Sequence, residues 1–232
     1  MQLSKNEDKA ISLLRNNGMD VFSSKDLQLF LGNRHQAYNI IKSLHKKGHI
    51  KRIKKGLYCF KETDEMIIGT AIIHPSYISF LSALNYYGYT DQIAVKTTIA
   101  TTRKKKHSEY AFACIKKNLF FGYISVNNLT IADKEKALID SLYLPRFSGG
   151  MKVIIESFKA AWNDINQKKI YEYAVKTRSK IVIRRLGFLT ESLGLKFKYG
   201  LSSHIGRGYG LFDPTKKRKG NYNKKWLLDV NI

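Results

Sequence analysis

The sequence predicts an α+β protein of two domains, and three observations lead to this prediction. The chain has 232 residues, which is enough for two domains of ordinary size. Its N-terminal quarter reads as three helices and a hairpin, whereas strand-like and helical segments alternate in the remainder. Hydrophobic residues make up 44% and charged residues 25% of the chain, as in folded rather than disordered proteins. We therefore expect separate domains at residues 1–64 and 65–232.

The first domain is predicted to begin with three helices. Residues 4–17 start with a capping pair, Ser4 and Glu7, and continue with an apolar stripe up to "NNGMD". A short second helix starts at Ser23 or Ser24 and stops at a glycine after two turns. In the third helix, "NRHQAYNIIKSLHKKG", the apolar residues fall within one arc and the polar and basic residues occupy the opposite side.

A basic hairpin is predicted directly after these helices, in the stretch "GHIKRIKKGLYCF" at 48–60. Lys or Arg occupies four of the five positions from 51 to 55, and Gly56 suits the left-handed position of a turn. From Asn33 to Lys61 the chain has nine Lys or Arg residues and no acidic residue. Three helices followed by such a hairpin predict a winged helix-turn-helix, whose third helix enters the major groove while the wing contacts phosphates or the minor groove.

The larger domain is predicted to mix helices and strands. A helix can begin near Thr63 to Glu65, and residues 66–88 are mostly apolar and read as helical. Residues 94–126 alternate as strands do, with the basic turn "RKKK" between two of them. Helices dominate from 133 to 194, and the Gly-rich basic tail after 200 ends in "KKWLLDVNI", which reads as a last strand.

Charge is the most unusual property of the composition. The chain has 41 Lys and Arg against 18 Asp and Glu, a formal net charge of +23. Residues 1–65 hold 13 basic and 7 acidic residues, or +6, which leaves +17 for residues 66–232. Such a surface attracts polyanions and releases counterions on binding them. Nucleic acid is therefore the leading class of partner, with a generally lysine-rich surface as the alternative explanation.

The sequence also predicts a cytoplasmic protein that does not bind membranes. No stretch of about 18 apolar residues is present to cross a bilayer. The N-terminus, "MQLSKNEDKAISLL", has acids soon after its first lysine and lacks the apolar run of a signal peptide. Cys59 and Cys114 lie far apart in apolar, strand-like contexts, which favours buried thiols in a reducing compartment over a disulfide.

Four stretches of the larger domain carry a family resemblance. They are "SALNYYGYTDQ" at 82–92, "IADKEKALIDSLYLPRFSGG" at 131–150, "RRLGFLTESLG" at 184–194 and "FDPTKKRKGNYNKKWLLDVN" at 212–231. Together with the first domain they resemble the antitoxins of type IV toxin–antitoxin systems, the AbiEi-like abortive-infection proteins. The chain departs from the family pattern at Lys134, where proline is common, and at Lys136, where arginine is common.

The resemblance implies a fold and a function. Proteins of this family pair an N-terminal winged helix-turn-helix with a C-terminal antitoxin domain. They bind inverted repeats upstream of their own operon and repress it. They also neutralise a nucleotidyltransferase-like toxin, usually without a stable complex. On this basis we expect a DNA-binding autorepressor and antitoxin that is not an enzyme and uses no cofactor or metal.

Candidate DNA contacts lie on the third helix and the hairpin. Gln36 and Asn39 have side-chain amides that can pair with adenine, and Arg34 or His35 can reach guanine or phosphate. The cations expected to contact phosphates or the neighbouring groove are Lys42, Lys46, Lys47, Lys51, Arg52, Lys54 and Lys55. Additional nucleic-acid contacts in the larger domain are predicted, against the alternative of a lysine-rich surface, at Arg103, Lys104, Lys105, Lys216, Lys217 and Arg218.

Two other functions stay open at this point. One is a winged-helix transcriptional regulator without a cognate toxin, whose C-terminal domain senses a ligand or partner. The other is a nuclease that uses Asp133, Glu135 and Asp140 to hold a metal ion. Helical spacing argues against the nuclease, because Asp133 suits a helix N-cap and the residues after it supply a packing face. The glycine-rich "GRGYG" at 206–210 does not open a helix and is predicted to be a turn.

Overall fold

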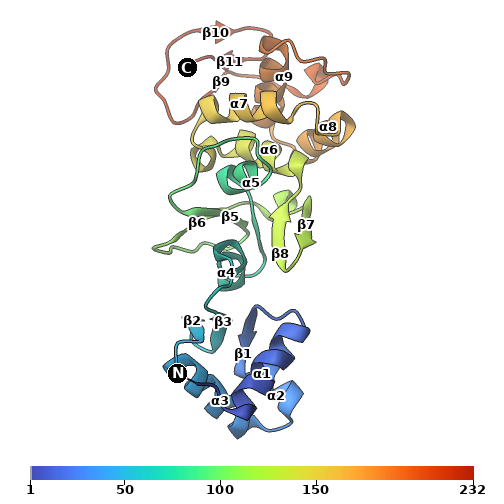
Figure 1. Cartoon of the computed structure of the whole chain (residues 1–232). Helices are drawn as coiled ribbons and strands as arrows, with labels where there is room; N and C mark the ends of the chain where they lie inside the picture. Colours follow the sequence, from blue (N-terminus) through green and yellow to red (C-terminus); the bar gives the residue numbers. More distant parts are fainter. Residues whose placement is uncertain (1) are drawn as a thin grey trace. The chain divides into compact units, whose positions relative to one another are not determined.

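The computed structural model describes residues 2–232 and has the α+β fold that the sequence predicts (Figure 1). It divides into two compact units: the residues up to His74 together with Ser125–Thr130, and Pro75–Ile124 together with Ile131–Ile232. This division differs from the boundary after residue 64 suggested by the sequence, because the next helix packs with the first unit.

Three helices open the first unit, as predicted. They are α1 (Lys5–Asn16), α2 (Ser24–Leu31) and α3 (Arg34–Lys46). Ser4 and Glu7 form the expected capping box of α1, and Ser23 accepts a hydrogen bond at the start of α2. Gly32 ends α2 with φ of 69°, a left-handed conformation that glycine adopts without strain and that lets α3 begin almost at once.

A three-stranded antiparallel sheet completes the core of the first unit. Its strands are β1 (Val21–Ser23), β2 (Ile50–Lys54) and β3 (Leu57–Phe60), in the order β1-β3-β2. The β2–β3 hairpin was predicted, with Gly56 at φ of 79° in its turn. The short strand β1 was not predicted. Phe22 on β1 packs against Phe60 on β3, with ring centroids 5.1 Å apart, and joins the buried faces of the three helices.

Helix α4 (Glu65–Ile72) extends the first unit beyond the hairpin. Asp64 caps its first turn, as the stretch near residues 63–65 suggested. At its other end the ammonium group of Lys54 donates a hydrogen bond to the carbonyl of Ile72 at 2.8 Å. Carbonyls of the last helical turn have no partner within the helix, so Lys54 both satisfies one of them and fixes α4 to β2.

Glu7 ties α1 to α3 and makes the first unit sensitive to acid. Its carboxylate accepts hydrogen bonds from Lys47 Nζ and Ser43 Oγ, each at 2.6 Å, and its side chain is almost fully buried. Lys47, then the backbone of Ser4 and the hydroxyl of Ser43, lower the pKa of Glu7 from 4.5 to about 2. Because the folded pKa is the lower one, the stabilisation is fully present above about pH 4.5 and is lost as the pH falls towards 2.

We expect Glu7→Gln to lower the free energy of unfolding of the first unit by about 1–3 kcal/mol at pH 7. The amide keeps the size of the side chain but loses the charge that Lys47 stabilises. Amide hydrogen exchange in α1 and α3 measures this difference for the first unit alone. The gap between the variant and the wild-type protein should shrink as the pH falls to 2.5. A gap of equal size at pH 7 and pH 2.5 would contradict the role given to Glu7.

A five-stranded mixed sheet belongs mainly to the second unit, although Ser125–Thr130, where its strands β7 and β8 are joined, groups with the first unit. Its strands are β4 (Ser76–Ile78), β5 (Thr97–Thr101), β6 (Tyr110–Cys114), β7 (Tyr123–Val126) and β8 (Leu129–Ala132), in the order β6-β5-β4-β8-β7. The strand-like pattern over 94–126 is thereby confirmed. Strand β4 lies within residues 66–88, which were predicted to be helical, so that prediction is wrong for this segment. The strand has three residues, all buried, and a short continuous apolar run looks the same in a helix.

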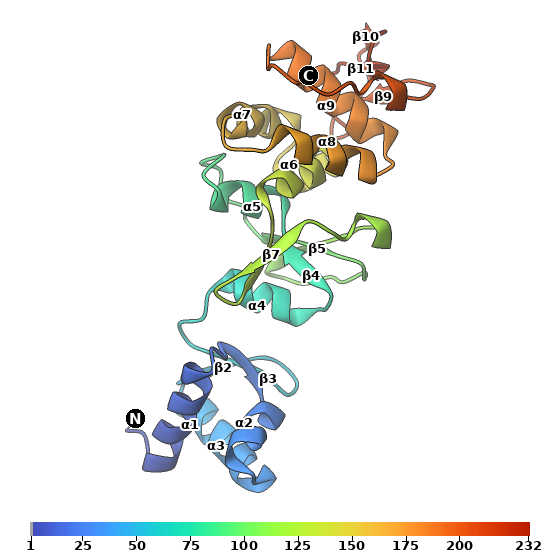
Figure 2. The ribbon, with the colours of Figure 1, turned by 90° about the vertical axis from the view of Figure 1, so that its right-hand side faces the viewer.

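Helices cover this sheet, and a second, smaller sheet lies beyond them (Figures 1 and 2). The helices are α5 (Phe80–Tyr86), α6 (Lys134–Tyr143), α7 (Met151–Ala161), α8 (Gln167–Lys176) and α9 (Lys180–Ser192). The small sheet consists of β9 (Gly210–Leu211), β10 (Tyr222–Asn223) and β11 (Leu228–Asp229). The helices after residue 133 and the strand near the C-terminus were predicted. None of the described helices is long and apolar enough to cross a membrane.

Gly187 shows how the tail packs onto α9. A Cβ atom at this position would lie only 2.1 Å from the ring of Trp226. Glycine therefore lets the indole ring rest directly on the helix backbone, although it costs helix stability relative to alanine. The contact joins two of the stretches that carry the family resemblance, 184–194 and 212–231, within one core.

The two cysteines differ in their surroundings. Both are free thiols; Cys59 is buried in β3 and Cys114 is exposed on β6. The expectation of two buried thiols is thus correct for Cys59 and wrong for Cys114. Strand β6 is an edge strand of its sheet, so an apolar, strand-like sequence context does not by itself imply burial there.

Candidate nucleic-acid interface and the polar network of the second unit

One face of α3 presents the residues predicted to contact DNA. The opposite face is buried through Ala37, Ile40, Ile41 and Leu44, so the polar side is left to solvent. Gln36 is half-buried, and the other candidates on this helix are exposed: Arg34, His35, Asn39, Lys42 and Lys46. Asn33 accepts a hydrogen bond from the backbone N–H of Gln36 at 3.0 Å, which caps the end of the helix that carries the predicted base-reading residues.

The structure brings α3 and the hairpin together around one hollow of about 210 Å³. Its lining residues are Tyr38, Ile41, Lys42 and His45 from α3 and Arg52 and Tyr58 from the hairpin. The rings of His45 and Tyr58 meet edge to face, 6.1 Å apart. Lys51, Arg52, Lys54 and Lys55 are all exposed along the same hairpin. Helix and hairpin thus form a single cationic surface, which we call the α3–hairpin surface.

Two of the predicted phosphate contacts also have partners within the protein. Lys47 pairs with Glu7 at 2.6 Å, and Lys54 donates to the end of α4. By contrast, Lys42, Lys51 and Arg52 form no ion pair with any residue from 2 to 232. Arg34, Lys46 and Lys55 have no ion pair among these residues either, so the charge of all six cations is available to a polyanion without breaking an ion pair.

Two residues of this region were missed from the sequence. Tyr38 is 58% exposed and Leu29, on α2, is 79% exposed. Both line a groove between α2 and α3 together with Arg34 and His35. Helical spacing could have found Tyr38, because it lies four residues from both Arg34 and Lys42 and shares their face. No sequence signal marks Leu29.

The basic clusters of the second unit lie on two separate loops. Arg103, Lys104 and Lys105 are exposed between β5 and β6, and Lys216, Lys217 and Arg218 are exposed between β9 and β10. The views in Figures 1 and 2 place the helices between these two loops. The two clusters thus belong to separate loops on opposite sides of the helices.

The second loop is held by a buried amide. Asn231 is fully buried, and its Nδ2 donates to the carbonyls of Asp213, Lys216 and Lys217 at 2.8, 3.2 and 3.1 Å. Its Oδ1 accepts from the backbone N–H of Asp213 at 2.8 Å. The cations of this loop are thus carried by a backbone with a defined conformation.

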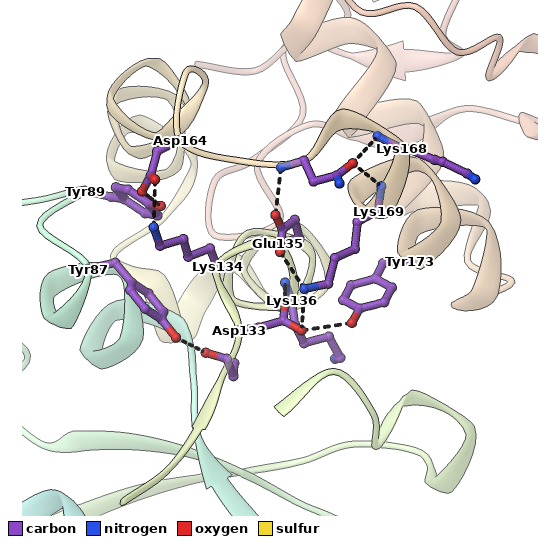
Figure 3. Close-up of polar contacts among 12 residues, drawn as sticks. Tyr87, Tyr89, Asp133, Lys134, Glu135, Lys136, Asp164, Lys168, Lys169 and Tyr173 are labelled. Atoms are coloured by element: carbon purple, nitrogen blue, oxygen red, sulfur yellow. Dashed lines mark hydrogen bonds and ion pairs between the residues drawn. The ribbon is translucent and has the colours of Figure 1, made fainter. Parts of the chain in front are cut away.

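Two of the carboxylates that suggested a nuclease, Asp133 and Glu135, belong to a network at the start of α6 (Figure 3). Asp133 caps α6 by accepting from the backbone N–H of Lys136 at 2.8 Å, as predicted. Its second oxygen accepts from the Tyr173 hydroxyl at 2.8 Å and lies 3.2 Å from Lys169 Nζ. Glu135 pairs with the same lysine at 3.0 Å. Burial, and then the hydrogen bond to Asp133, raises the pKa of Tyr173 to about 12, so it stays a donor.

Asp140 is held by a fully buried lysine. Lys136 has no exposed side-chain surface and forms an ion pair with Asp140 one turn further along α6. Asp140 also accepts hydrogen bonds from Tyr77 at 2.9 Å and Ser79 at 2.8 Å. Burial, and then the charge of Asp140, raises the pKa of Tyr77 well above its ordinary value. The three carboxylates are thus bound by donors of the protein itself, which favours a structural role over metal binding.

Comparison with known proteins gives a fold but no family. Neither a protein-family model nor a curated protein matches the chain in sequence. The structure is similar to the crystal structure of the RV2827C protein from Mycobacterium tuberculosis, with a TM-score of 0.69 and 13% sequence identity. The match covers 98% of this chain and 92% of that one. At this identity it establishes a shared mixed α+β architecture along nearly the whole chain and nothing more specific.

Proposed function

We propose that the chain is a DNA-binding antitoxin of the AbiEi-like type IV class that represses its own operon. In this proposal the first unit is a winged helix-turn-helix, with α3 as its recognition helix and the β2–β3 hairpin as its wing. The second unit neutralises a nucleotidyltransferase-like toxin without forming a stable complex with it. The protein has no enzymatic activity of its own and acts in the cytoplasm.

The α3–hairpin surface is the observation that carries the DNA-binding half of the proposal. Residues 33–61 contain no acidic side chain, and the unpaired cations Lys42 and Arg52 line one hollow from two different elements. Cations on a helix and a neighbouring ribbon can neutralise phosphates on both sides of a groove. The exposed amide of Asn39 lies on the same helix and has the donor and acceptor that adenine requires.

The antitoxin half rests on the family resemblance of the second unit. A plain transcriptional regulator would have the same α3–hairpin surface, so DNA binding alone does not separate the two functions. No observation favours the nuclease, because Asp133, Glu135 and Asp140 are engaged with Lys169, Lys136 and tyrosine hydroxyls.

Two assays on the full-length protein test the two halves. Binding to the inverted repeat nearest its own promoter, measured at several salt concentrations, tests repression; affinity should fall steeply as salt rises. Co-expression with the product of the neighbouring gene, scored by growth, tests neutralisation. Growth rescue decides for an antitoxin, whereas operator binding without rescue decides for the regulator.

Asn39→Ala should cost about 1–3 kcal/mol of binding free energy at one base position of the operator and leave the other positions unaffected. The amide makes a contact that only one base can satisfy, whereas a phosphate contact is the same at every sequence. The matched control is Lys46→Ala on the same helix, which should weaken binding to all sequences alike. Titration of single-base operator variants separates the two patterns. A uniform loss from Asn39→Ala would exclude it as a base reader.

A further inference from the structure

A cavity of about 400 Å³ in the second unit is lined by two arginines. It lies where the end of α6 and the following 3₁₀ turn (Pro145–Ser148) meet α9 and the segment after β9. The residues that matter for its chemistry are Tyr143, Pro145, Arg146, Ile181, Arg185 and Thr215. Its volume falls within the range of small-molecule sites, which is roughly 300–1,000 Å³.

Arg185 is a buried cation without an ion-pair partner among the described residues. It is only 3% exposed, and its guanidinium donates to the carbonyls of Leu142, Leu211 and Phe212 at 2.6, 2.9 and 2.9 Å. These bonds account for three of the five N–H donors of an arginine. All three acceptors are neutral. Burial lowers the pKa of Arg185 to about 10, which reflects the cost of keeping this charge out of water.

Asp213 is the carboxylate whose charge acts on Arg185, but its oxygens accept hydrogen bonds from other groups. Oδ1 accepts from the backbone N–H of Thr215 at 2.9 Å and from its hydroxyl at 2.6 Å, and Oδ2 accepts from the backbone N–H of Met151 at 3.3 Å. The aspartate favours the charged form of Arg185 from a distance without forming an ion pair with it. An anion inside the cavity would supply the direct partner that a buried guanidinium normally has.

The rest of the lining suits an anion that carries a flat apolar group. Arg146 is exposed and has no carboxylate partner among residues 2–232; its guanidinium lies 4.9 Å from the ring centre of Phe147. Two arginine forks together match the several oxygens of a phosphate dianion better than a single carboxylate. Tyr143, Pro145 and Ile181 provide aromatic and aliphatic walls against which a heterocycle can pack.

We propose that this cavity binds a nucleoside monophosphate, with its phosphate between Arg146 and Arg185 and its base and sugar against Tyr143, Pro145 and Ile181. The site lies entirely within the second unit and uses none of the α3–hairpin surface. Nucleotide binding here therefore does not depend on operator binding, and its test does not require the toxin.

Titration calorimetry on the full-length protein tests the proposal at constant ionic strength. The probes are AMP, GMP, CMP and UMP, the four corresponding nucleosides, and inorganic phosphate. At least one nucleotide should bind about tenfold or more tightly than both its nucleoside and inorganic phosphate. Arg146→Gln, at an exposed position without an ion pair among the described residues, should weaken that binding about tenfold or more. Lys117→Gln removes the same charge from an exposed site on another element and should leave the affinity unchanged.

Three results would overturn the proposal. Equal affinity for inorganic phosphate and nucleotide would reduce the site to a simple anion site, and equal affinity for nucleoside and nucleotide would remove the role of the arginines. Equal effects of Arg146→Gln and Lys117→Gln would show attraction to the net charge alone. Arg185→Lys keeps the charge but loses the fork, and it should also weaken binding wherever circular dichroism shows the variant folded.

Discussion

The combined variant Lys42→Glu, Lys51→Glu, Arg52→Glu should lose operator binding by at least about a thousandfold. Each substitution replaces a charge-assisted contact to phosphate, worth about 1.5–3 kcal/mol, with a repulsion. These three cations of the α3–hairpin surface have no carboxylate partner among the described residues, so the change should not disturb an internal ion pair. The dependence of log affinity on log salt should also become shallower by about 2.7, from three lost phosphate contacts. Gel-shift titrations over a salt series measure both quantities.

The matched control is Lys5→Glu, Lys9→Glu, Lys61→Glu. It changes the net charge of the protein by the same amount, at exposed positions that do not line the hollow between α3 and the hairpin. If binding depends on the α3–hairpin surface, the control should retain most of its affinity. Equal loss in both variants would mean that total charge, and not this surface, drives binding.

The same charge-reversed variant should still rescue cells from the toxin. All four stretches that resemble the antitoxin family lie after residue 80, whereas the three substitutions lie in the first unit. Growth during co-expression with the toxin, beside a promoter reporter, tests whether repression and neutralisation are separable. A variant that is folded and abundant yet fails to rescue growth would show that neutralisation depends on DNA binding.

Local signals made much of the first unit predictable. Helix caps such as Ser4 and the glycines at 32 and 56 act within a few residues, and they fixed the ends of α1, α2 and the hairpin. Strands β1 and β4 have three residues each and gain their hydrogen bonds from partners distant in sequence. A pattern of period two cannot show itself over so short a segment, so these strands follow from tertiary contacts.

In the candidate sites, too, features set by neighbouring residues could be predicted, whereas contacts between distant segments could not. The exposed face of α3 follows from helical periodicity, so its DNA-binding candidates could be chosen from the sequence. The contacts of Lys47 with Glu7 and of Lys54 with α4 could not be predicted from the sequence. Each joins residues too far apart in the chain for a local pattern to encode. The sequence also does not show that Arg185 is buried without an ion-pair partner among the described residues. Its guanidinium instead donates hydrogen bonds to carbonyls of two other segments.

Lys136 is the clearest example of a buried contact that the sequence does not predict. A lysine four residues before an aspartate usually indicates a solvent-exposed pair on a helix. Here the side chain has no exposed surface, and its ammonium lies 4.8 Å from the ring centre of Phe121. What buries the pair is the sheet and loop that pack over α6, including Tyr77 and Ser79 from 60 or so residues earlier in the chain. Position 136, where the family that the sequence resembles commonly has arginine, is thus a buried position with a defined partner.

Lys136→Met should destabilise the second unit by about 3–5 kcal/mol, because it leaves the carboxylate of Asp140 buried without its cation. The hydroxyls of Tyr77 and Ser79 remain, but two neutral donors do not replace a buried charge. Urea unfolding followed by the fluorescence of Trp162 and Trp226 measures the loss, since both tryptophans belong to the second unit. The control Lys168→Met removes an exposed lysine 3.9 Å from Glu172 and should cost less than about 0.5 kcal/mol.

A double-mutant cycle separates the ion pair from simple packing. In Lys136→Met, Asp140→Asn the buried negative charge is removed together with its partner, so the double variant should be more stable than Lys136→Met alone. The amide can still accept hydrogen bonds from Tyr77 and Ser79, which keeps the rest of the network intact. Recovery of about 1 kcal/mol or more would show that the cost of Lys136→Met lies in the stranded carboxylate. Additive losses in the two single variants would instead show that Lys136 stabilises the fold through the contacts of its hydrocarbon chain.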